Sequence, residues 1–489
     1  MTAEAGQQGG NPLRAIFEAE TVAFVGASNK LTTMGTTQML NTLKGGYTGE
    51  VFPVHPSENP VLGRPAYPRL TDLPEPVDLA VLTVPTEAAL EVLRDAARRG
   101  IRNLVVTTAG FREGGETGRQ REREIVDFAR QAGIRFVGPN CIGVLNTKTG
   151  LNTTFFPYLH APGPLSLASQ SGTYVTQTIN MLSRWGIGLC KAISIGNAAD
   201  IHLHHCLDYF ADDDDTRAVG LYIEGIPDGR AFLQAARRCT RKKPVVALYV
   251  GGTEGGRRSG LSHTGALAGQ DEIYAGAFRQ AGIIRARTVA DLYQWGWALA
   301  AQPLPRGPRM AILTHSGGPA TSMSDAVYRQ GMQLCEFSGP LKKEIRKLVP
   351  HTAAVGNPID LTFSMDQRLI AETLPRMLME DPGVDGLLMH GLQGTSFYTD
   401  AIRLADGLIK PEAPEEQVVE FIEAIYKPLA KLPEETGKPL VMSSFVDPND
   451  HLVKMIKDRR IPVYDTPERA VSAMAALHRY AEFRRKRGY

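Results

Sequence analysis

The sequence predicts an α/β protein built from several parallel sheets. Short runs of Val, Ile and Leu recur along the 489 residues without strict alternation, as in strands that are buried on both faces of a parallel sheet. A glycine-containing loop and a helical pattern follow most of these runs. Glycine supplies 49 of the 489 residues, which is above its usual share of about 7%. Since a domain usually holds about 100–200 residues, the length favours three domains.

The apolar runs fall into three groups, and we expect domains at residues 12–145, 150–300 and 308–480. The strands expected in the first domain are 21–25, 50–54, 77–84, 101–107 and 134–137. Those expected in the second are 165–169, 191–195, 218–224 and 244–250, and those in the third are 310–314, 384–390, 439–445 and 462–464. Because ligands bind beyond the carboxyl ends of parallel strands, the loops that follow these runs are the candidate sites.

Charge and composition exclude several classes of protein. The net charge is +2, which gives no general signal for nucleic-acid or membrane binding. The five cysteines show no CxxC spacing, so neither a disulfide scaffold nor a zinc ribbon is expected. No apolar stretch approaches the roughly 18–20 residues of a membrane span, and the N-terminus lacks a signal-peptide core. We therefore expect a cytoplasmic protein with no membrane, nucleic-acid or metal site.

Two loops have the composition of anion sites. VAFVGASNK places a Gly-Ala-Ser turn after the first strand, where the next helix begins and can hold a phosphate. GxGxxG is absent, and a tight turn without a ligand is the alternative. SQSGTYV places Ser169, Ser171 and Thr173 beside Gly172 at a strand end, with ordinary N-capping as the alternative. The serines lack the flanking glycines of a G-x-S-x-G hydrolase elbow.

A third loop carries a candidate nucleophile. GGTEGGRRSGLSHTGALAG contains His263, and imidazole is a competent nucleophile near neutral pH. Glu224 ends an earlier apolar run and could orient that imidazole. Taken alone, a histidine in such a loop is more often simply solvated, and the glutamate would equally fit a helix cap or an ion pair.

Two further polar stretches have simpler interpretations. IHLHH contains His202, His204 and His205; two of these could share one face of a strand, but no typical metal-ligand set accompanies them. DDDD at 212–215 predicts an exposed turn.

Taken in order, the loop motifs resemble one family. The motifs are VAFVGAS, GYTGEVFPVHP, PVDLAVLTVP, TTAGFREGG, GPNCIGVLN, LASQSGTYV, SIGNAAD, LYIEGIPDGR, SHTGALAG, LTHSGGPA and NPIDLT. This series is similar to the α subunit of nucleoside-diphosphate-forming acyl-CoA synthetases, which are relatives of succinyl-CoA synthetase. The resemblance runs from about residue 12 to about residue 475.

The resemblance implies a Rossmann-like CoA-binding domain followed by two flavodoxin-like ligase domains. It implies that His263 in SHTGALAG carries a phosphoryl group and that Glu224 in YIEG holds that histidine. The SQSGT loop would cradle the phosphate through Ser171, Gly172 and Thr173. The residues implied in CoA binding are Gly26, Ala27, Ser28, Pro53, Val84 and Pro85, with Asn140 and Cys141 near the thiol end of CoA.

Three departures from the family pattern concern histidines. PVHP replaces the usual PVNP, so His55 changes a contact on the CoA side. THSGG replaces the usual TNSGG, so the third domain differs from the family at His315. The stretch IHLHH after Asp200 is also unusual. The SHTG and YIEG elements are intact, so these changes bear on acid specificity more than on the phosphoryl chemistry.

The resemblance implies an acid–CoA ligase that interconverts acyl-CoA, ADP and phosphate with a carboxylic acid, ATP and CoA. ATP or ADP, with Mg²⁺, would bind an ATP-grasp β subunit in an α₂β₂-type assembly, because the three α/β units leave no room for about 200 further residues. A non-catalytic CoA-binding or regulatory protein is the first alternative, and intact His263 and Glu224 argue against it. An NAD-linked oxidoreductase is the second, and the missing GxGxxG argues against that.

Overall fold

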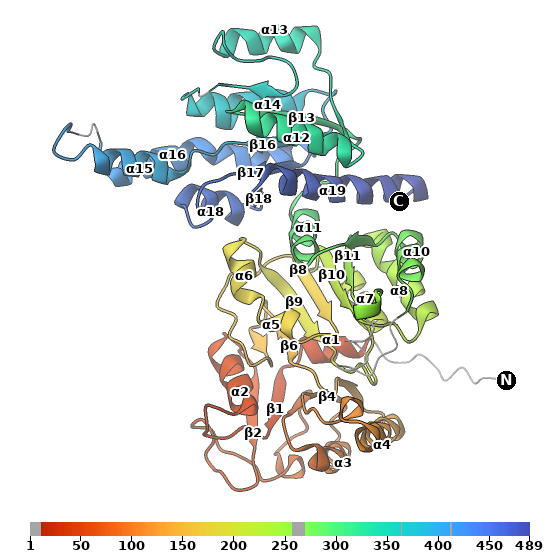
Figure 1. Cartoon of the computed structure of the whole chain (residues 1–489). Helices are drawn as coiled ribbons and strands as arrows, with labels where there is room; N and C mark the ends of the chain where they lie inside the picture. The colour runs from red at the N-terminus through yellow and green to blue at the C-terminus, as the bar shows by residue number, and fades with distance from the viewer. Residues whose placement is uncertain (1–10, 257–268, 363, 411–412) are drawn as a thin grey trace. The chain divides into compact units, whose positions relative to one another are not determined.

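The computed structural model describes residues 11–256, 269–362, 364–410 and 413–489. Within these residues the chain forms three mainly parallel sheets flanked by helices (Figure 1), which confirms the predicted α/β class. The chain divides into two compact units. The first holds residues up to 183 together with 188–292, and the second holds 184–187 together with 293–489. Two of the sheets belong to the first unit and the third sheet belongs to the second unit.

The first sheet has five parallel strands in the order β2-β1-β3-β4-β5. The strands are β1 (Thr21–Val25), β2 (Glu50–Val54), β3 (Leu79–Leu82), β4 (Asn103–Val106) and β5 (Arg135–Val137). Every residue of β3, the central strand, is buried, as expected for an apolar run covered on both faces. Because the strands are parallel, the carboxyl ends of β1, β2 and β3 meet at one edge of this sheet.

Four helices accompany the first sheet: α1 (Pro12–Phe17), α2 (Met34–Lys44), α3 (Ala89–Arg99) and α4 (Glu116–Ala132). Short 3₁₀ turns, η1 (Leu70–Asp72), η2 (Thr86–Ala88) and η3 (Arg112–Gly114), lie in the loops between them. The side chain of Asn11 caps α1 by accepting the N–H of Leu13 at 3.0 Å. α3 and α4 pack against each other, and each ends at a glycine in the left-handed conformation.

The second sheet has seven strands in the order β12-β11-β10-β8-β9-β6-β7. The strands are β6 (Gly143–Asn146), β7 (Leu151–Asn152), β8 (Leu165–Ser169), β9 (Leu189–Ser194), β10 (Ala218–Ile223), β11 (Val245–Tyr249) and β12 (Ile284–Ala286). β6 runs antiparallel to β9 and to β7, while the other neighbours are parallel. Residues 143–145, placed by the sequence in the first domain, thus start a strand of the second sheet.

The helices of this sheet are α5 (Thr173–Thr176), α6 (Ile179–Arg184), α7 (Leu203–Asp212), α8 (Gly229–Lys242) and α10 (Asp271–Ala281), while most of α11 (Val289–Ala301) belongs to the second unit. α1 and α7 share one hydrophobic core, in which the rings of Phe17 and Tyr209 stack with their centroids 5.1 Å apart. Asn146 of β6 also donates to the carbonyl of Phe17 at 2.9 Å. These contacts join the first two sheets into one unit.

The third sheet has six strands, with β14-β13-β16-β17-β18 in order and β15 paired to β13. The strands are β13 (Arg309–Thr314), β14 (Gln333–Leu334), β15 (Ile359–Asp360), β16 (Gly386–His390), β17 (Leu440–Ser443) and β18 (Val463–Tyr464). All of the pairings are parallel. The carboxyl ends of β16, β17 and β18 consequently lie along one edge.

The helices of the second unit are α12 (Gly317–Arg329), α13 (Gly339–Leu348), α14 (Leu374–Glu380), α15 (Gly394–Leu404), α16 (Glu415–Tyr426), α17 (Leu432–Thr436), α18 (His451–Asp458) and α19 (Pro467–Arg487), with shorter turns η4 (Leu369–Thr373) and η5 (Pro428–Lys431). The longest, α19, packs on α12 and on β16, β17 and β18. In the part of the chain that the structure describes, no helix is long and apolar enough to cross a bilayer.

Candidate functional site

One glutamine joins the loop that carries the predicted phosphate-binding residues to the loop that carries Glu224, and we call its hydrogen bonds the Gln170 bridge. Gln170 follows β8, and its Oε1 accepts the backbone N–H groups of Glu224 at 2.6 Å and Gly225 at 3.0 Å. Its Nε2 donates to the carbonyl of Gly225 at 2.9 Å. These three bonds span more than 50 residues of sequence and fix the loop after β10 against the loop after β8.

The loop after β8 is rigidly built. The Ser169 hydroxyl donates to the carbonyl of Ser171 at 2.6 Å and accepts the N–H of Ser171 at 3.2 Å. Gly172 precedes α5, and a Cβ at this position would lie 1.9 Å from Cγ1 of Ile142. Only glycine therefore lets this loop approach the chain that enters β6. Ser171 and Gly172 are half-buried, and Thr173 is exposed.

Glu224 lies directly after β10 and is half-buried. It stands at the carboxyl end of a parallel strand, as the sequence predicts, and beside the Ser169–Thr173 loop through Gln170. His263, the residue that Glu224 is expected to orient, lies outside the described residues. The roles of Glu224, His263, Ser171, Gly172 and Thr173 stay predictions.

A buried polar network links the carboxyl edges of the first and second sheets. Asn197, after β9, donates through Nδ2 to Glu113 at 2.6 Å and to Glu122 at 2.8 Å, and its carbonyl accepts from Arg112. Asn140, after β5, donates to the side-chain oxygen of Asn197 at 3.3 Å. Burial disfavours a charged Glu113, yet the bonds from Asn197 and from two backbone N–H groups hold its pKa below its usual range.

Sequence reasoning missed Gln170, Asn197 and Glu113. Each stands inside a motif that was recognised, namely LASQSGTYV, SIGNAAD and TTAGFREGG. For Gln170 and Asn197, an amide between small residues just after a strand was the available signal, whereas Glu113 follows Arg112 in the η3 turn and carried no such signal. Their partners are distant in sequence, so pairing them required the structure.

The residues predicted to bind CoA in the first domain gather at one edge of the first sheet. Gly26 follows β1 and donates its N–H to the carbonyl of Val54 at the end of β2 at 3.0 Å. Pro53 of β2 pairs in register with Phe24 of β1. Val84 and Pro85 follow β3, and the N–H of Val84 approaches the Thr108 hydroxyl at 3.3 Å. This edge has the geometry of the ligand crevice of an open parallel sheet.

Three of the predicted CoA residues are largely enclosed. Ala27 and Ser28 are buried, and the Ser28 hydroxyl lies 3.2 Å from the hydroxyl of Thr36 in α2. Cys141 is 3% exposed, and its thiol donates to the carbonyl of Val106 at 3.3 Å. Burial raises the pKa of this thiol to about 12, so it stays neutral.

The three histidines of IHLHH lie on a helix rather than on a strand. His202 caps α7, and the ring centroids of His204 and His205 are 4.0 Å apart. Burial lowers the pKa of all three, and that of His205 to about 3, so they remain neutral. His202 and His204 line a small cavity together with Gln170 and Gly225. Among the described residues, no cluster of three or more His, Cys, Asp and Glu side chains is arranged to hold a metal ion.

The other two unusual histidines have different settings. Nδ1 of His55 accepts the N–H of Glu58 at 3.0 Å and so caps the turn after β2. His315 follows β13 and is buried, and within the described residues neither ring nitrogen has a hydrogen-bond partner. Burial lowers the pKa of His315.

Three family profiles match successive parts of the chain. Residues 20–147 match the family described as CoA binding domain, and 162–299 match the succinyl-CoA ligase like flavodoxin domain. Residues 310–406 match the Ligase-CoA domain. The expected Rossmann-like domain followed by two ligase-type domains is thereby confirmed as the fold class.

Relatives that match over nearly the whole chain show which family it belongs to. The α subunit of acetate–CoA ligase [ADP-forming] II from Pyrococcus furiosus is 34% identical over 95% of this chain and 97% of its own length. The chain belongs to the family of ADP-forming acid–CoA ligase α subunits. Acetate–CoA ligase [ADP-forming] I of Archaeoglobus fulgidus is 32% identical over 96% of this chain but only 64% of its own length.

A solved structure of the ligase family has the same fold. Acetyl-coenzyme A synthetase 1 of Ca. Korarchaeum cryptofilum, in complex with phosphate and ADP, matches with a TM-score of 0.85 and 32% identity. The match covers 97% of this chain and 98% of that chain. The comparisons thus support the ligase interpretation and give no support to the non-catalytic or the NAD-linked alternative.

The Gln170 bridge leads to the first testable prediction. Gln170→Leu should lower the melting temperature and slow phosphorylation of the chain by about 10- to 100-fold, because a loop displaced by about 1 Å misplaces a reacting group. The buried N–H of Gly225 would also lose its acceptor, at a cost of about 1–3 kcal/mol. Differential scanning calorimetry and phosphate labelling measure the two effects.

Gln177→Leu makes the same chemical change at an exposed position just beyond α5. It should leave both measurements at their wild-type values. A Gln170→Leu protein that is phosphorylated at the wild-type rate would show that the bridge does not position the site.

Proposed function

We propose that this chain is the α subunit of an enzyme that interconverts acyl-CoA, ADP and phosphate with a carboxylic acid, ATP and CoA. Within it, residues 12–145 bind CoA, 150–300 carry the phosphoryl group, and 308–480 form a second ligase-type domain. The relatives named above are acetate–CoA ligases, so acetate is the first acid to assay.

The observation that carries this proposal is the Gln170 bridge. It holds Glu224 beside the Ser169–Thr173 loop, at the carboxyl edge of the second sheet. A carboxylate next to a loop of hydroxyls and backbone N–H groups suits a phosphorylated imidazole, because the loop can hold the phosphoryl oxygens while the carboxylate orients the ring. His263 is the imidazole that the sequence supplies.

The chemistry proceeds in two transfers on this chain. Inorganic phosphate attacks the thioester carbonyl of acyl-CoA, which releases CoA and leaves an acyl phosphate. A ring nitrogen of His263 then attacks the phosphorus, the bond to the acyl oxygen breaks, and the carboxylic acid leaves. Ser171, Gly172 and Thr173 would stabilise the charge on the transferring phosphoryl group.

CoA would bind along the edge of the first sheet. Gly26, Ala27, Ser28, Pro53, Val84 and Pro85 form its proposed site. Since the Cys141 thiol is enclosed, we assign the contact near the CoA thiol to the backbone around Asn140 and Cys141. Asn197 holds that segment in place, because it accepts a hydrogen bond from Asn140 and donates one to Glu113.

A partner would complete the reaction. The P. furiosus relative is named as an α subunit and matches this chain over 97% of its length, while the A. fulgidus relative is longer than the matched region. We propose that an ATP-grasp β subunit takes the phosphoryl group from His263 and passes it to ADP, with Mg²⁺ at the nucleotide, in a cytoplasmic α₂β₂-type complex. The glycine-rich sequence around His263 suits a carrier that serves two sites.

Isolated and reconstituted protein test this function. The chain alone should bind CoA, which raises its melting temperature, yet should release no ADP from acetate, ATP and CoA. Adding the partner should restore ADP release. NAD serves as the control ligand and should leave the melting temperature unchanged. ADP release by the isolated chain would contradict the need for a partner, and a shift with NAD instead of CoA would contradict the proposed function.

A further inference from the structure

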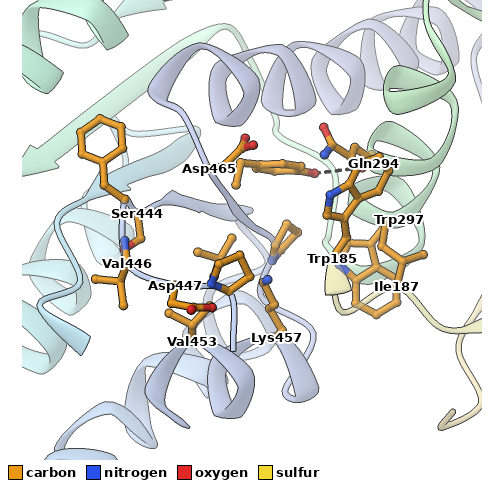
Figure 2. A pocket seen from close by; sticks show the side chains of 15 residues that line it. Trp185, Ile187, Gln294, Trp297, Ser444, Val446, Asp447, Val453, Lys457 and Asp465 are labelled. Carbon is orange, nitrogen blue, oxygen red and sulfur yellow. Dashed lines mark hydrogen bonds between the residues drawn. The ribbon is translucent and has the colours of Figure 1, made fainter. Parts of the chain in front are cut away.

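A pocket of about 230 Å³ lies in the second unit, at the carboxyl ends of β17 and β18. Aromatic rings supply much of its wall, namely Trp185, Trp297, Phe445 and Tyr464. Figure 2 shows Trp185 and Trp297 on one side, Val446 on the opposite side and Lys457 between them. Tyr464 is fixed in place, because its hydroxyl donates to the carbonyl of Gln294 at 2.9 Å.

Two hydrogen-bond donors in this wall are poorly satisfied. Trp297 is 6% exposed, and its indole Nε1–H is buried without an acceptor among the described residues. Lys457 of α18 is 5% exposed, and the hydrogen bond that its ammonium makes is a long one, 3.4 Å to the carbonyl of Arg184. Native structures pair nearly all buried donors, so these two groups indicate a missing acceptor.

The position of Lys457 is built into the fold. The aliphatic part of its side chain packs against Gly186, where the Cβ of any larger residue would lie only 2.8 Å from Cδ of Lys457. Burial lowers the pKa of Lys457 to about 8, although Asp465, Asp447 and Asp458 favour its charged form. The amine is therefore mainly protonated at neutral pH.

The two carboxylates of the lining already have partners. Both oxygens of Asp465 accept from Arg469, at 2.9 and 2.7 Å. Asp447 is exposed and accepts the N–H of Asn449 at 2.7 Å. The buried groups with open hydrogen-bonding capacity, Trp297 and Lys457, are both donors, so an occupant that reaches them must supply acceptor oxygens, which a cation does not.

We propose that this pocket binds a small aromatic carboxylate, with its ring against Trp185 and Trp297 and its carboxylate on Lys457 and the Trp297 indole N–H. The volume suits this class, because a cavity of about 150 Å³ is enough for benzene. Aromatic faces also favour a flat ring over an aliphatic chain. The proposal is independent of the ligase chemistry, and it assigns a second ligand site to the chain.

The tryptophans provide the assay. The sequence has 3 tryptophans, and Trp295, the one outside the pocket lining, is the internal reference. In full-length protein labelled with ¹⁵N-tryptophan, phenylacetate should shift the indole N–H signals of Trp185 and Trp297 and leave that of Trp295 in place. Phenethylamine carries the same ring on a cation, and acetate lacks the ring; both should shift nothing.

The charge on Lys457 is tested by a matched pair of variants. Lys457→Met should weaken phenylacetate binding at least about tenfold, since it removes a charge-assisted hydrogen bond. Lys454→Met makes the same change at an exposed position on α18 and should bind like wild type. Affinity should be steady below pH 8 and fall about tenfold per unit above it, as the amine loses its proton.

Several outcomes would overturn the proposal. One is the absence of any shift with ~10 mM phenylacetate, which corresponds to binding weaker than about −3 kcal/mol. Another is equal binding of phenethylamine, which would indicate a cation site. A third is unchanged affinity in a folded Lys457→Met protein. None of these results bears on CoA binding or ADP release, so failure here is distinguishable from failure of the proposed function.

Discussion

Replacing His263 with alanine should abolish phosphorylation of the chain and all ADP formation by the reconstituted enzyme. Alanine offers no nitrogen to attack the acyl phosphate, and no second nucleophile is proposed in the reaction. Radiolabelled phosphate, supplied with acetyl-CoA, measures the intermediate directly. In wild-type protein the label should be acid-labile and base-stable, as a phosphorylated imidazole is, and in His263→Ala it should be missing.

The control separates this loss from damage to the fold. His351→Ala removes an exposed histidine of the second unit and should be labelled like wild type. CoA should raise the melting temperature of both variants equally, because the proposed CoA residues lie on the first sheet. Label that persists in His263→Ala would rule out His263 as the phosphoryl carrier.

Most strands of the fold could be predicted from sequence because burial on both faces imposes a strong pattern. The strands β6, β7, β12, β14 and β15, each of two to four residues, were missed. The run at 77–84 contains β3, in which each residue is buried, and the run at 165–169 coincides with β8. Loops that end such strands meet at one sheet edge by topology alone. For that reason the positions of Gly26, Ser171 and Glu224 at strand ends were predictable, while their side-chain partners were not.

Polar contacts between distant segments were beyond sequence reasoning. The stretch at 212–215 was predicted to be an exposed turn, but Asp213 is buried and pairs with the ammonium of Lys191 at 2.8 Å. A run of acidic residues normally stays solvated, and the lysine that compensates for this burial lies more than 20 residues earlier. Likewise, His202 and His204 were compared with a strand face, whereas the local pattern forms α7.

The pocket of the second unit illustrates the same limit. Lys457 stands on a helix whose neighbouring lysine, Lys454, is exposed, and nothing in the local sequence separates the two. The contact with the segment at Gly186 buries Lys457, across more than 270 residues of chain. Burial of this kind depends on tertiary packing rather than on local periodicity.

Glu224→Gln should slow phosphorylation of the chain by about 10²–10⁴-fold, the usual range for loss of a group that assists proton transfer or orients its partner. The carboxylate is expected to hold the imidazole in the tautomer that exposes the attacking nitrogen, and to stabilise the positive charge that develops on the ring. A neutral amide can do neither well. Rapid-quench labelling with acetyl phosphate measures the step without the partner subunit.

The structure makes this substitution a selective test of the side chain. Gln170 holds residue 224 through the backbone N–H, at 2.6 Å, so the amide variant should keep the loop in place and retain the wild-type melting temperature. Glu272→Gln makes the same change at an exposed position on α10 and should be phosphorylated normally. Glu224→Asp keeps the charge and should recover part of the rate. If Glu224→Gln were phosphorylated as fast as wild type, Glu224 would be a structural residue, and the orientation of His263 would have to come from another group.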